Sequence, residues 1–421
     1  MPRPSFFDER FPAFHSRDFR ALWAGQVISA AGSQMQFAAL NWQIYELTGS
    51  SVALGAVGLV RVIPIILFSL IGGTIADAYD RRRLLLGTQS ALTLVALALG
   101  YFSLRGQTTL PVIYLLTALG AAAVAFDNPA RQALVPSLVP REHLPNAFAI
   151  SSTGFQVATI AGPVLAGVVI GKLGAGWAYL INAISFIAVI FALLTLQHRP
   201  EKTDEAATRP GWDSLKEGIN FVVGTPILVS TMVLDFIATF FSSASALLPI
   251  FAKDILHVGP EGFGILSAFP AAGSLITGAL MTLLPPIKQQ GRALLWSVLA
   301  YGCATVGFGL SPFFWQSALF LAATGAADTV STVLRQTIRQ TVTPDRLRGR
   351  MVAFNMIFFM GGPQLGELEA GLLAKWMGAI GSVVSGGVAT LLFAGIVAAR
   401  SPFLRRWRLE PSSAEETGAV R

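Results

Sequence analysis

The stretch Gly72-Gly73-Thr74-Ile75-Ala76-Asp77-Ala78-Tyr79-Asp80-Arg81-Arg82-Arg83 joins two long apolar runs, at roughly 51–76 and 84–104. Its glycines allow one helix end to lie close against a neighbouring helix. A charged side chain at the centre of a lipid bilayer costs about 2.5 kcal/mol or more, so this charged stretch must stay at the membrane surface. Short loops that are rich in arginine remain on the cytoplasmic side. The stretch therefore predicts a short cytoplasmic loop between two membrane-spanning helices.

The composition of the whole chain supports a membrane protein. The chain has 421 residues, of which 53% are hydrophobic and 13% are charged, and its mean hydropathy is +0.61. Soluble domains contain about 25% charged residues. Apolar runs of about twenty residues, which suffice to cross a bilayer, recur along the chain. These features predict a polytopic membrane protein whose first partner is the lipid bilayer.

The net charge of +7 reflects topology rather than a binding surface for nucleic acid. Alternate loops contain few basic residues, namely Arg105, Lys172, Lys253 and Lys375. Almost all other basic residues lie in the remaining loops, the N-terminal segment and the C-terminal tail. This asymmetry follows the positive-inside rule. It predicts that both termini are cytoplasmic and that nucleic acid is not a partner.

The apolar segments predict an all-α membrane protein with twelve transmembrane helices in two pseudo-symmetric six-helix bundles. The expected spans are 20–45, 51–76, 84–104, 110–135, 147–171, 176–197, 222–250, 261–284, 293–311, 314–338, 350–374 and 379–399. The corresponding domains are an N-terminal bundle (1–196), a polar cytoplasmic linker (197–220), a C-terminal bundle (221–400) and a cytoplasmic tail (401–421).

The two halves repeat in sequence. Arg131-Gln132 recurs as Arg335-Gln336, an offset of 204 residues. The same offset relates Pro140 to Pro344, Gly162 to Gly366, Gly167 to Gly371 and Gly174 to Gly378. Repeated halves in a membrane protein of this length predict two bundles around a shared substrate site near the bilayer midplane. The second copy of the arginine-rich loop, 281–292, lacks the aspartate of the first.

Residues Gly73, Asp77, Arg81 and Arg82 resemble the loop signature between the second and third helices of the major facilitator superfamily. Ala78 and Asp80 depart from that signature. The resemblance implies the twelve-helix transporter fold. It also implies a cytoplasmic gate, in which Asp77, Arg81 and Arg82 contact the fourth helix and the start of helix eleven near 349–351. A solvated loop that only directs topology is the alternative.

Two further segments resemble the exporters of this superfamily. Gly154, Gly162, Pro163 and Gly167 in the fifth span are similar to the Gly-Pro motif of proton-coupled exporters, although small residues also serve ordinary helix packing. The segment 126–142 resembles the branch that includes enterobactin exporters and macrolide efflux proteins. That resemblance implies export of siderophore-like or drug-like molecules, with protons as the exchanged ion. An acid that related exporters often carry near Ser33 is absent here.

Charged residues inside the spans are the candidates for coupling. Asp127 and Arg131 are one helical turn apart and can neutralise each other. Because a charge pair that faces lipid is unfavourable, we expect it to face the cavity or another helix; a purely structural pair that closes the cytoplasmic side is the alternative. Four other candidates are Asp235 in the seventh span and, in the helix that matches the fourth, Asp328, Arg335 and Arg339.

The eleventh span contains two acids, Glu367 and Glu369, which are two residues apart and therefore point to different sides of the helix. Arg61 lies at a similar depth in the second span. We expect Arg61 to pair with Glu367 or Glu369 and to hold an outer gate shut; a pair that merely fastens two helices is the alternative. The polar side chains expected to line the cavity from the first span are Gln26, Ser33, Gln36 and Asn41.

The sequence predicts no cofactor, no metal and no enzymatic activity. Cys303 is the single cysteine, the four histidines fall near loops or termini, and no phosphate-binding loop for ATP is present. The predicted function is therefore secondary active export of small amphipathic molecules across the bacterial cytoplasmic membrane, by a monomer that alternates between two conformations. An importer or lipid transporter on the same scaffold remains an alternative, as does a membrane enzyme or receptor.

Overall fold

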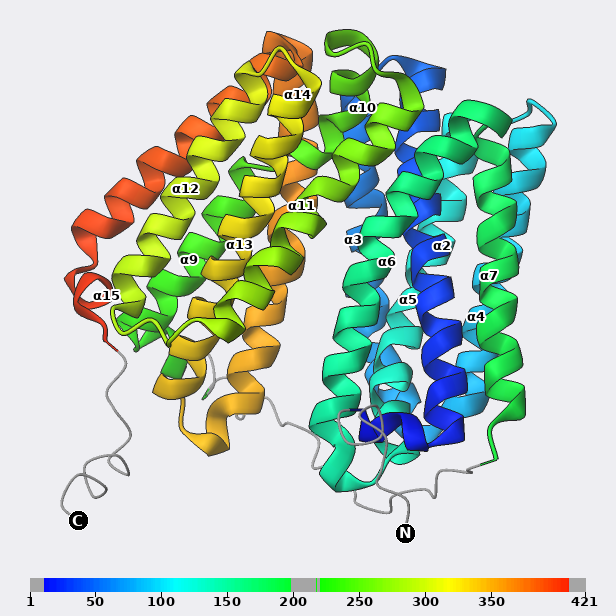
Figure 1. Cartoon of the computed structure of the whole chain (residues 1–421), viewed down its shortest axis with the longest axis horizontal. Helices are drawn as coiled ribbons and strands as arrows, with labels where there is room; N and C mark the ends of the chain where they lie inside the picture. Colours follow the sequence, from blue (N-terminus) through cyan, green and yellow to red (C-terminus); the bar gives the residue numbers. More distant parts are fainter. Residues whose placement is uncertain (1–10, 198–216, 218–219, 409–421) are drawn as a thin grey trace. The chain divides into compact units, whose positions relative to one another are not determined.

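A computed structural model describes residues 11–197, 217 and 220–408 of the chain. Within these ranges the side chains of 69–78, 345–346, 349–350, 352–354 and 356–360 lie outside the description. Every regular element in the described part is a helix (Figure 1). The main helices are α2 Arg17–Thr48, α3 Ser51–Ala78, α4 Arg81–Leu104, α5 Leu110–Leu134, α6 Leu144–Leu173, α7 Ala175–Thr195, α9 Pro226–Phe241, α10 Leu248–Ile250, α11 Gly259–Leu283, α12 Gln290–Leu310, α13 Phe314–Val342, α14 Asp345–Arg400 and α15 Pro402–Arg406.

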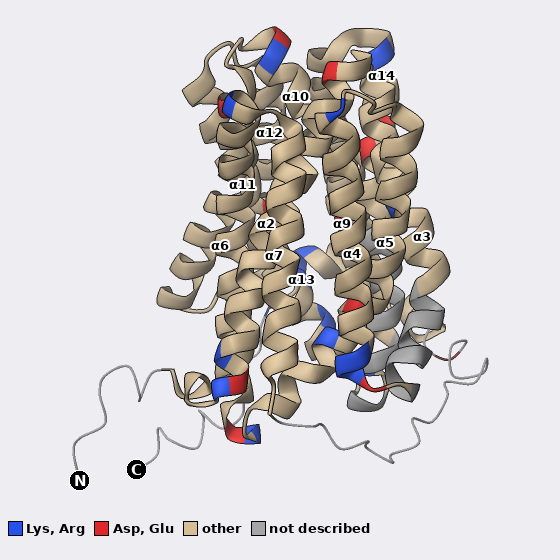
Figure 2. Cartoon of the chain, turned by 90° about the vertical axis from the view of Figure 1, so that its right-hand side faces the viewer, with Lys and Arg blue, Asp and Glu red and all other residues tan. Residues whose placement is uncertain are grey.

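Ten helical segments among the described residues are long and apolar enough to cross a membrane, so the chain is a multi-pass membrane protein. The 32-residue α2 is not one of the ten, since amide and hydroxyl side chains interrupt its apolar residues. The 56-residue α14 consists of two helical parts, because Gly378 between them has a φ of 77°. A positive φ of this kind is readily adopted only by glycine. Lys, Arg, Asp and Glu are concentrated near the helix ends (Figure 2).

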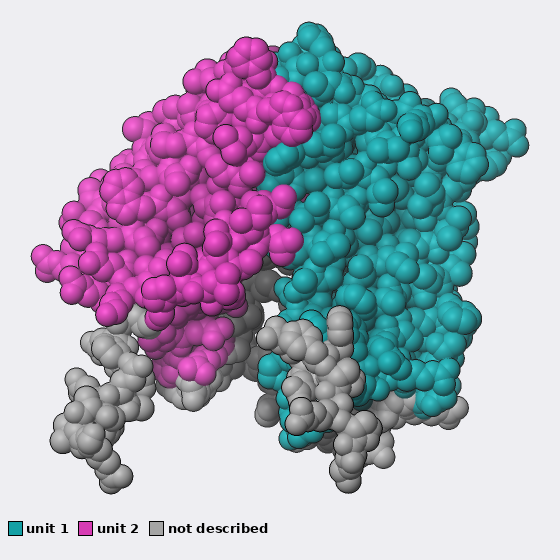
Figure 3. All heavy atoms as spheres, viewed as in Figure 1, with its two compact units in different colours: residues 1–206, 245–271 teal, residues 207–244, 272–421 magenta. Residues whose placement is uncertain are grey.

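The chain divides into two compact units (Figure 3). Unit 1 comprises residues 1–206 and 245–271, and unit 2 comprises 207–244 and 272–421. Unit 1 therefore includes a segment from the second half of the sequence. The predicted linker, 197–220, and the predicted tail, 401–421, lie largely outside the described residues.

In unit 1, α2 packs closely on α6 and α7. A β-carbon at Gly32 of α2 would lie 2.5 Å from Oδ1 of Asn182 on α7, so only glycine permits this approach. At the N-terminal end of α2 the core contains Phe19 and Leu22, packed with Leu134 of α5 and Leu193 of α7.

The predicted seventh span, 222–250, corresponds to one candidate span but not to one uninterrupted helix. Helix α9 ends at Phe241, and a 3₁₀ turn (Ala244–Leu247), α10 and a π-helical turn (Phe251–Ile255) follow. Two local features favour the break. The Ser243 hydroxyl donates to the Thr239 carbonyl at 2.6 Å, and Pro249 has no backbone N–H to donate to the preceding turn.

Candidate functional site

Unit 1 contains a buried carboxylate near the C-terminal end of α5. Asp127 on α5 is 1% exposed. Its Oδ1 accepts hydrogen bonds from Thr88 Oγ1 at 2.8 Å and from Gln89 Nε2 at 2.7 Å, both on α4. Its Oδ2 accepts from Arg131 Nε at 3.1 Å and forms an ion pair with the same guanidinium. Four donors thus replace the water that a buried carboxylate loses.

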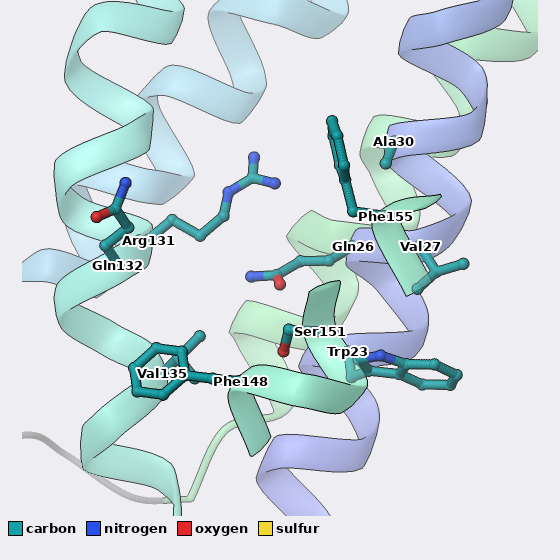
Figure 4. A pocket seen from close by; sticks show the side chains of 10 residues that line it. All are labelled: Trp23, Gln26, Val27, Ala30, Arg131, Gln132, Val135, Phe148, Ser151 and Phe155. Atoms are coloured by element: carbon teal, nitrogen blue, oxygen red, sulfur yellow. The ribbon is translucent and has the colours of Figure 1, made fainter. Parts of the chain in front are cut away.

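Arg131 connects this carboxylate to a cavity of about 200 Å³ (Figure 4). Its side chain is 29% exposed, and in Figure 4 it and the Gln26 side chain of α2 extend toward one another. Aromatic side chains form much of the remaining wall. The lining residues are Trp23, Gln26, Val27, Ala30, Arg131, Gln132, Val135, Phe148, Ser151 and Phe155.

The cavity combines one cation, two amides, a hydroxyl and three aromatic rings. Its cation is held in place because Asp127 Oδ2 binds the guanidinium of Arg131. A cation can attract an aromatic face as well as an anionic oxygen. The Trp23 indole is fixed by its hydrogen bond to the Ile150 carbonyl, at 3.2 Å. Such a lining suits an amphipathic molecule with aromatic and oxygen-rich parts.

Unit 2 contains a larger ionic cluster. Asp235 on α9, 3% exposed, lies 2.9 Å from Arg335 and 3.4 Å from Arg339, both on α13. Arg339 also donates to the hydroxyl and the carbonyl of Thr231, each at 3.2 Å. Asp328, whose side chain is 47% exposed, lies 3.6 Å from Arg335. Two arginines and two aspartates balance, as a buried ionic cluster requires.

The two arginine sites are related by the sequence repeat. Arg335 corresponds to Arg131, and Ser331 corresponds to Asp127. Arg335 donates to Ser331 at 2.8 Å, so the bond to its own helix is retained although the acid is lost. The nearest neutralising carboxylate is Asp235 on α9, at 2.9 Å, and Asp328 on the arginine's own helix lies farther away, at 3.6 Å. The same arginine position therefore has its nearest carboxylate on its own helix in unit 1 and on a second helix in unit 2.

The arginines of the opening stretch cap two helix ends. Arg81 donates to the Ala133 carbonyl at 3.1 Å, in the last turn of α5, and α5 corresponds to the fourth predicted span. Arg82 donates to the carbonyls of Leu194 at 2.8 Å and Leu196 at 3.4 Å, at the end of α7. Cations are favourable at these carbonyl-rich ends. Gly73 and Asp77 lie in the part of α3 whose side chains are outside the description, so the predicted contact with helix eleven stays a prediction.

The glycines of the fifth span lie where α6 approaches neighbouring segments closely. A β-carbon added at Gly154 would lie 2.6 Å from the Val27 side chain. A β-carbon added at Gly162 would lie 2.6 Å from the Ala31 carbonyl oxygen. At Gly167 it would lie 2.6 Å from the carbonyl oxygen of Pro260. Pro163 in turn packs against Gly264. These residues therefore join α6 to α2 and to the segment 259–264.

A second contact with the 245–271 segment lies at the far end of α2. The Tyr45 hydroxyl donates to Asp254 Oδ2, and Lys253 Nζ lies 5.8 Å from the Tyr45 ring centroid. One helical turn earlier, Trp42 packs on Phe263 with centroids 5.5 Å apart. We call the three residues Tyr45, Lys253 and Asp254 the Tyr45 latch.

The remaining candidates are placed as follows. Arg61 lies over the Phe37 ring, 4.3 Å from its centroid. Glu367 and Glu369 are half-buried on α14, whose neighbouring Gly362 and Gly366 pack on α9. Since Arg61 and the two glutamates belong to different units, their pairing stays a prediction.

Of the polar candidates on α2, Gln26 lines the cavity in Figure 4. Gln36 accepts a hydrogen bond from Asn182 at 2.8 Å, Asn41 is 7% exposed, and Ser33 is exposed. Sequence reasoning missed Thr88, Gln89 and the Tyr45 latch. A polar pair in an apolar span was the only sequence signal for the first two.

Comparison with known proteins agrees with this architecture. The chain is 26% identical over 401 residues to the enterobactin exporter EntS of Escherichia coli O6:K15:H31 (strain 536 / UPEC), covering 95% of this chain and 96% of that protein. EntS of Escherichia coli O81 (strain ED1a) is 25% identical over 393 residues, covering 93% of this chain and 94% of that protein.

Solved structures support the fold. A bacterial homolog of the human lysosomal transporter Spinster, in an inward-facing conformation, matches with a TM-score of 0.71 at 16% identity, covering 95% of this chain and 99% of that chain. A bacterial homologue of the iron transporter ferroportin, also inward-facing, matches with a TM-score of 0.70 at 16% identity, covering 91% and 98%. The family model described as transmembrane secretion effector matches residues 9–416. The chain therefore belongs to the transmembrane secretion effector family of the major facilitator superfamily, and the predicted resemblance is confirmed.

Proposed function

We propose that this protein is a secondary active transporter that exports siderophore-like or drug-like amphipathic molecules across the bacterial cytoplasmic membrane. The observation that carries the proposal is the cavity of Figure 4, where Arg131, anchored by buried Asp127, faces Gln26 and an aromatic wall. The relatives are named as enterobactin exporters, which supports export of a siderophore-like molecule. The guanidinium would bind its oxygens, and the rings of Phe148 and Phe155 would stack on its aromatic part.

The proposed topology has twelve transmembrane helices with both termini in the cytoplasm. It adds α2 and the first part of α14 to the ten apolar candidate spans. The amides and hydroxyls of α2 make bonds inside unit 1, for example from Gln34 to Thr159 at 3.1 Å, and this lowers their cost in a membrane. The arginine-rich end that contains Arg81 and Arg82 is then cytoplasmic.

Transport would proceed by alternating access. On this topology the Tyr45 latch lies at the outer side, and its contacts with the 245–271 segment would close that side in one state. Arg81 and Arg82, with Asp77, would close the cytoplasmic side in the other. The pair of Arg61 with Glu367 or Glu369 would add to the outer closure, and substrate or protons would shift the balance between the two states.

Proton antiport would supply the energy. Asp127, Asp235, Asp328, Glu367 and Glu369 are the intramembrane carboxylates that could exchange a proton. Asp127 and Asp235 are buried and paired with arginines, whereas Asp328, which lies 3.6 Å from Arg335, is half exposed. We therefore place proton exchange at Asp328, Glu367 or Glu369, and anchoring of the arginines at Asp127 and Asp235.

The test is efflux from proteoliposomes loaded with a catecholate siderophore, with and without a proton gradient. Gradient-dependent efflux that is lost in Arg131→Gln supports the proposal. Substrate movement that is insensitive to the gradient and unchanged in Arg131→Gln would overturn it.

In cells, Asp77→Asn should impair efflux while membrane insertion stays intact. Inverted vesicles distinguish an exporter from an importer on the same scaffold, because only an exporter accumulates substrate in them.

A further inference from the structure

A second cavity, of about 530 Å³, lies in unit 2 where the chain leaves the last long helix. It is formed by the start of α12 and the residues around the end of α15. The six residues that line it are Gln289, Arg292, Arg405, Arg406, Trp407 and Arg408. Four of the six are arginines, and none is an acid. We call this cavity the arginine cavity.

The walls of the arginine cavity are fixed to the body of unit 2. Leu404 is fully buried in the core that contains Leu294 and Val298 of α12. The backbone N–H of Gly291 donates to the Trp407 carbonyl at 3.3 Å. A β-carbon at Gly291 would lie 2.8 Å from the Leu404 carbonyl carbon, so the close approach needs glycine. The arginines are therefore carried on a docked segment of the chain.

The chemistry of the cavity is that of an anion site built from donors. Arg405, Arg406 and Arg408 are exposed, and Arg292 donates to Gln289 Oε1 at 3.3 Å. The Trp407 indole N–H is buried and has no hydrogen-bond partner among the described residues. Guanidinium forks bind phosphate oxygens in pairs, more selectively than ammonium groups do. A phosphate would neutralise the arginines and could accept the unpartnered N–H.

The position of the cavity favours a lipid headgroup over a soluble compound as the phosphate-bearing ligand. It lies directly after Arg400, the last residue of α14, which is the end of a candidate membrane span. Phe403 on α15 is 70% exposed although it is aromatic. Aromatic residues next to a cluster of arginines are typical of the boundary between acyl chains and headgroups. A soluble phosphate compound gains nothing from Phe403, whereas a lipid has an acyl chain to place there.

We propose that the arginine cavity binds the phosphate of an anionic phospholipid headgroup, with Phe403 against its acyl chain. The proposal rests on the membrane location of the chain. Only the choice of leaflet, which would be the cytoplasmic one, rests on the proposed topology. The proposal does not depend on transport. Arg405 and Arg406 would supply two of the four positive charges, and Trp407 one neutral hydrogen bond.

The experiment measures retention of phosphatidylglycerol and of phosphatidylcholine by the purified full chain, using native mass spectrometry in a mild detergent. Each arginine near a membrane surface changes affinity for anionic lipid about fivefold. Arg405→Gln with Arg406→Gln should therefore weaken phosphatidylglycerol binding about 30-fold. The matched control is Arg83→Gln with Arg141→Gln, which removes the same charge from exposed positions outside the cavity. It should leave binding within about twofold of the parent.

Two further measurements distinguish lipid binding in the arginine cavity from diffuse surface charge and from a soluble phosphate ligand. Arg405→Lys with Arg406→Lys keeps the charge but not the planar forks, and it should lose part of the binding. Equal losses in the cavity variant and the control variant would overturn the proposal, since diffuse surface charge would then explain binding. Displacement of phosphatidylglycerol by inorganic phosphate at comparable concentration would also overturn it, and would assign the site to a soluble ligand. Normal elution of each variant in size-exclusion chromatography establishes that it is folded.

Discussion

The Asp127–Arg131 pair allows one prediction in which burial decides the outcome. Replacing either partner removes the same ion pair, yet the group left behind differs. Arg131→Gln leaves a carboxylate that is 1% exposed, whereas Asp127→Asn leaves a guanidinium whose side chain is 29% exposed. Water can reach the second group but not the first. We therefore expect Arg131→Gln to be the more destabilising change.

The magnitudes follow from the bonds that remain. After Arg131→Gln, the carboxylate keeps its bonds from Thr88 and Gln89 but lacks a counter-charge, and a buried ion without its partner costs about 3–5 kcal/mol. After Asp127→Asn, the amide oxygen can still accept from Thr88 and Gln89. The loss is then the charge-assisted bonds to a partly hydrated arginine, about 1–2 kcal/mol. The double variant leaves no charge to bury, and its cost should be below about 1 kcal/mol.

The assay is denaturant-induced unfolding of the purified variants in one detergent, combined with siderophore efflux from proteoliposomes. The expected order of stability is parent and double variant, then Asp127→Asn, then Arg131→Gln. The double variant should be stable but inactive, because the cavity has lost its cation. An Arg131→Gln protein as stable as Asp127→Asn would refute the burial argument. Full efflux by the double variant would refute the substrate role of Arg131.

Three further outcomes are expected. Tyr45→Phe removes the phenol donor of the Tyr45 latch and should favour the state open at that end about tenfold. The measurement is the rate at which a thiol reagent labels Phe263→Cys in a cysteine-free background, and this rate should rise correspondingly. An unchanged labelling rate would exclude the latch. Gly162→Ala should destabilise unit 1 by about 1–3 kcal/mol, because its β-carbon would lie 2.6 Å from a carbonyl oxygen. Gly87→Ala, with no atom within 4 Å, is the control and should be neutral or slightly stabilising. Asp235→Asn leaves two buried guanidinium groups facing a neutral amide and should cost about 3–5 kcal/mol, visible as a lower melting temperature than that of Asp127→Asn.

Much of the fold could be predicted because membrane insertion depends on length and apolarity, which are local properties of sequence. The span predicted at 84–104 corresponds to α4, Arg81–Leu104, and that at 176–197 to α7, Ala175–Thr195. The break after Phe241 was not predicted. Ser242 and Ser243 are compatible with a transmembrane helix, and only their bonds in the folded chain, such as Ser242 to Thr390 at 2.8 Å, show where they are used.

The site was predictable only where its residues are close in sequence. Asp127 and Arg131 are one turn apart, so helical geometry alone could place them together. The partners of Asp235 are about one hundred residues away, and no periodicity relates them. Thr88 and Gln89 were missed for a different reason, since a hydroxyl or an amide in a span is common and its partner is set by packing between helices. Sequence therefore supplied the charges, and the fold supplied most of their partners.

The unequal placement of the two counter-ions has a mechanical consequence. In unit 2, moving α9 away from α13 would separate Asp235 from both arginines, so these helices should behave as a stiff pair. In unit 1, Arg131 takes its counter-ion with it on α5, and no ion pair among the described residues joins α5 to α2 or α6. The walls of the Figure 4 cavity can spread without breaking a charge pair. We therefore expect the cavity of unit 1 to adjust its width to substrates of different size more easily than a cavity between α9 and α13 could.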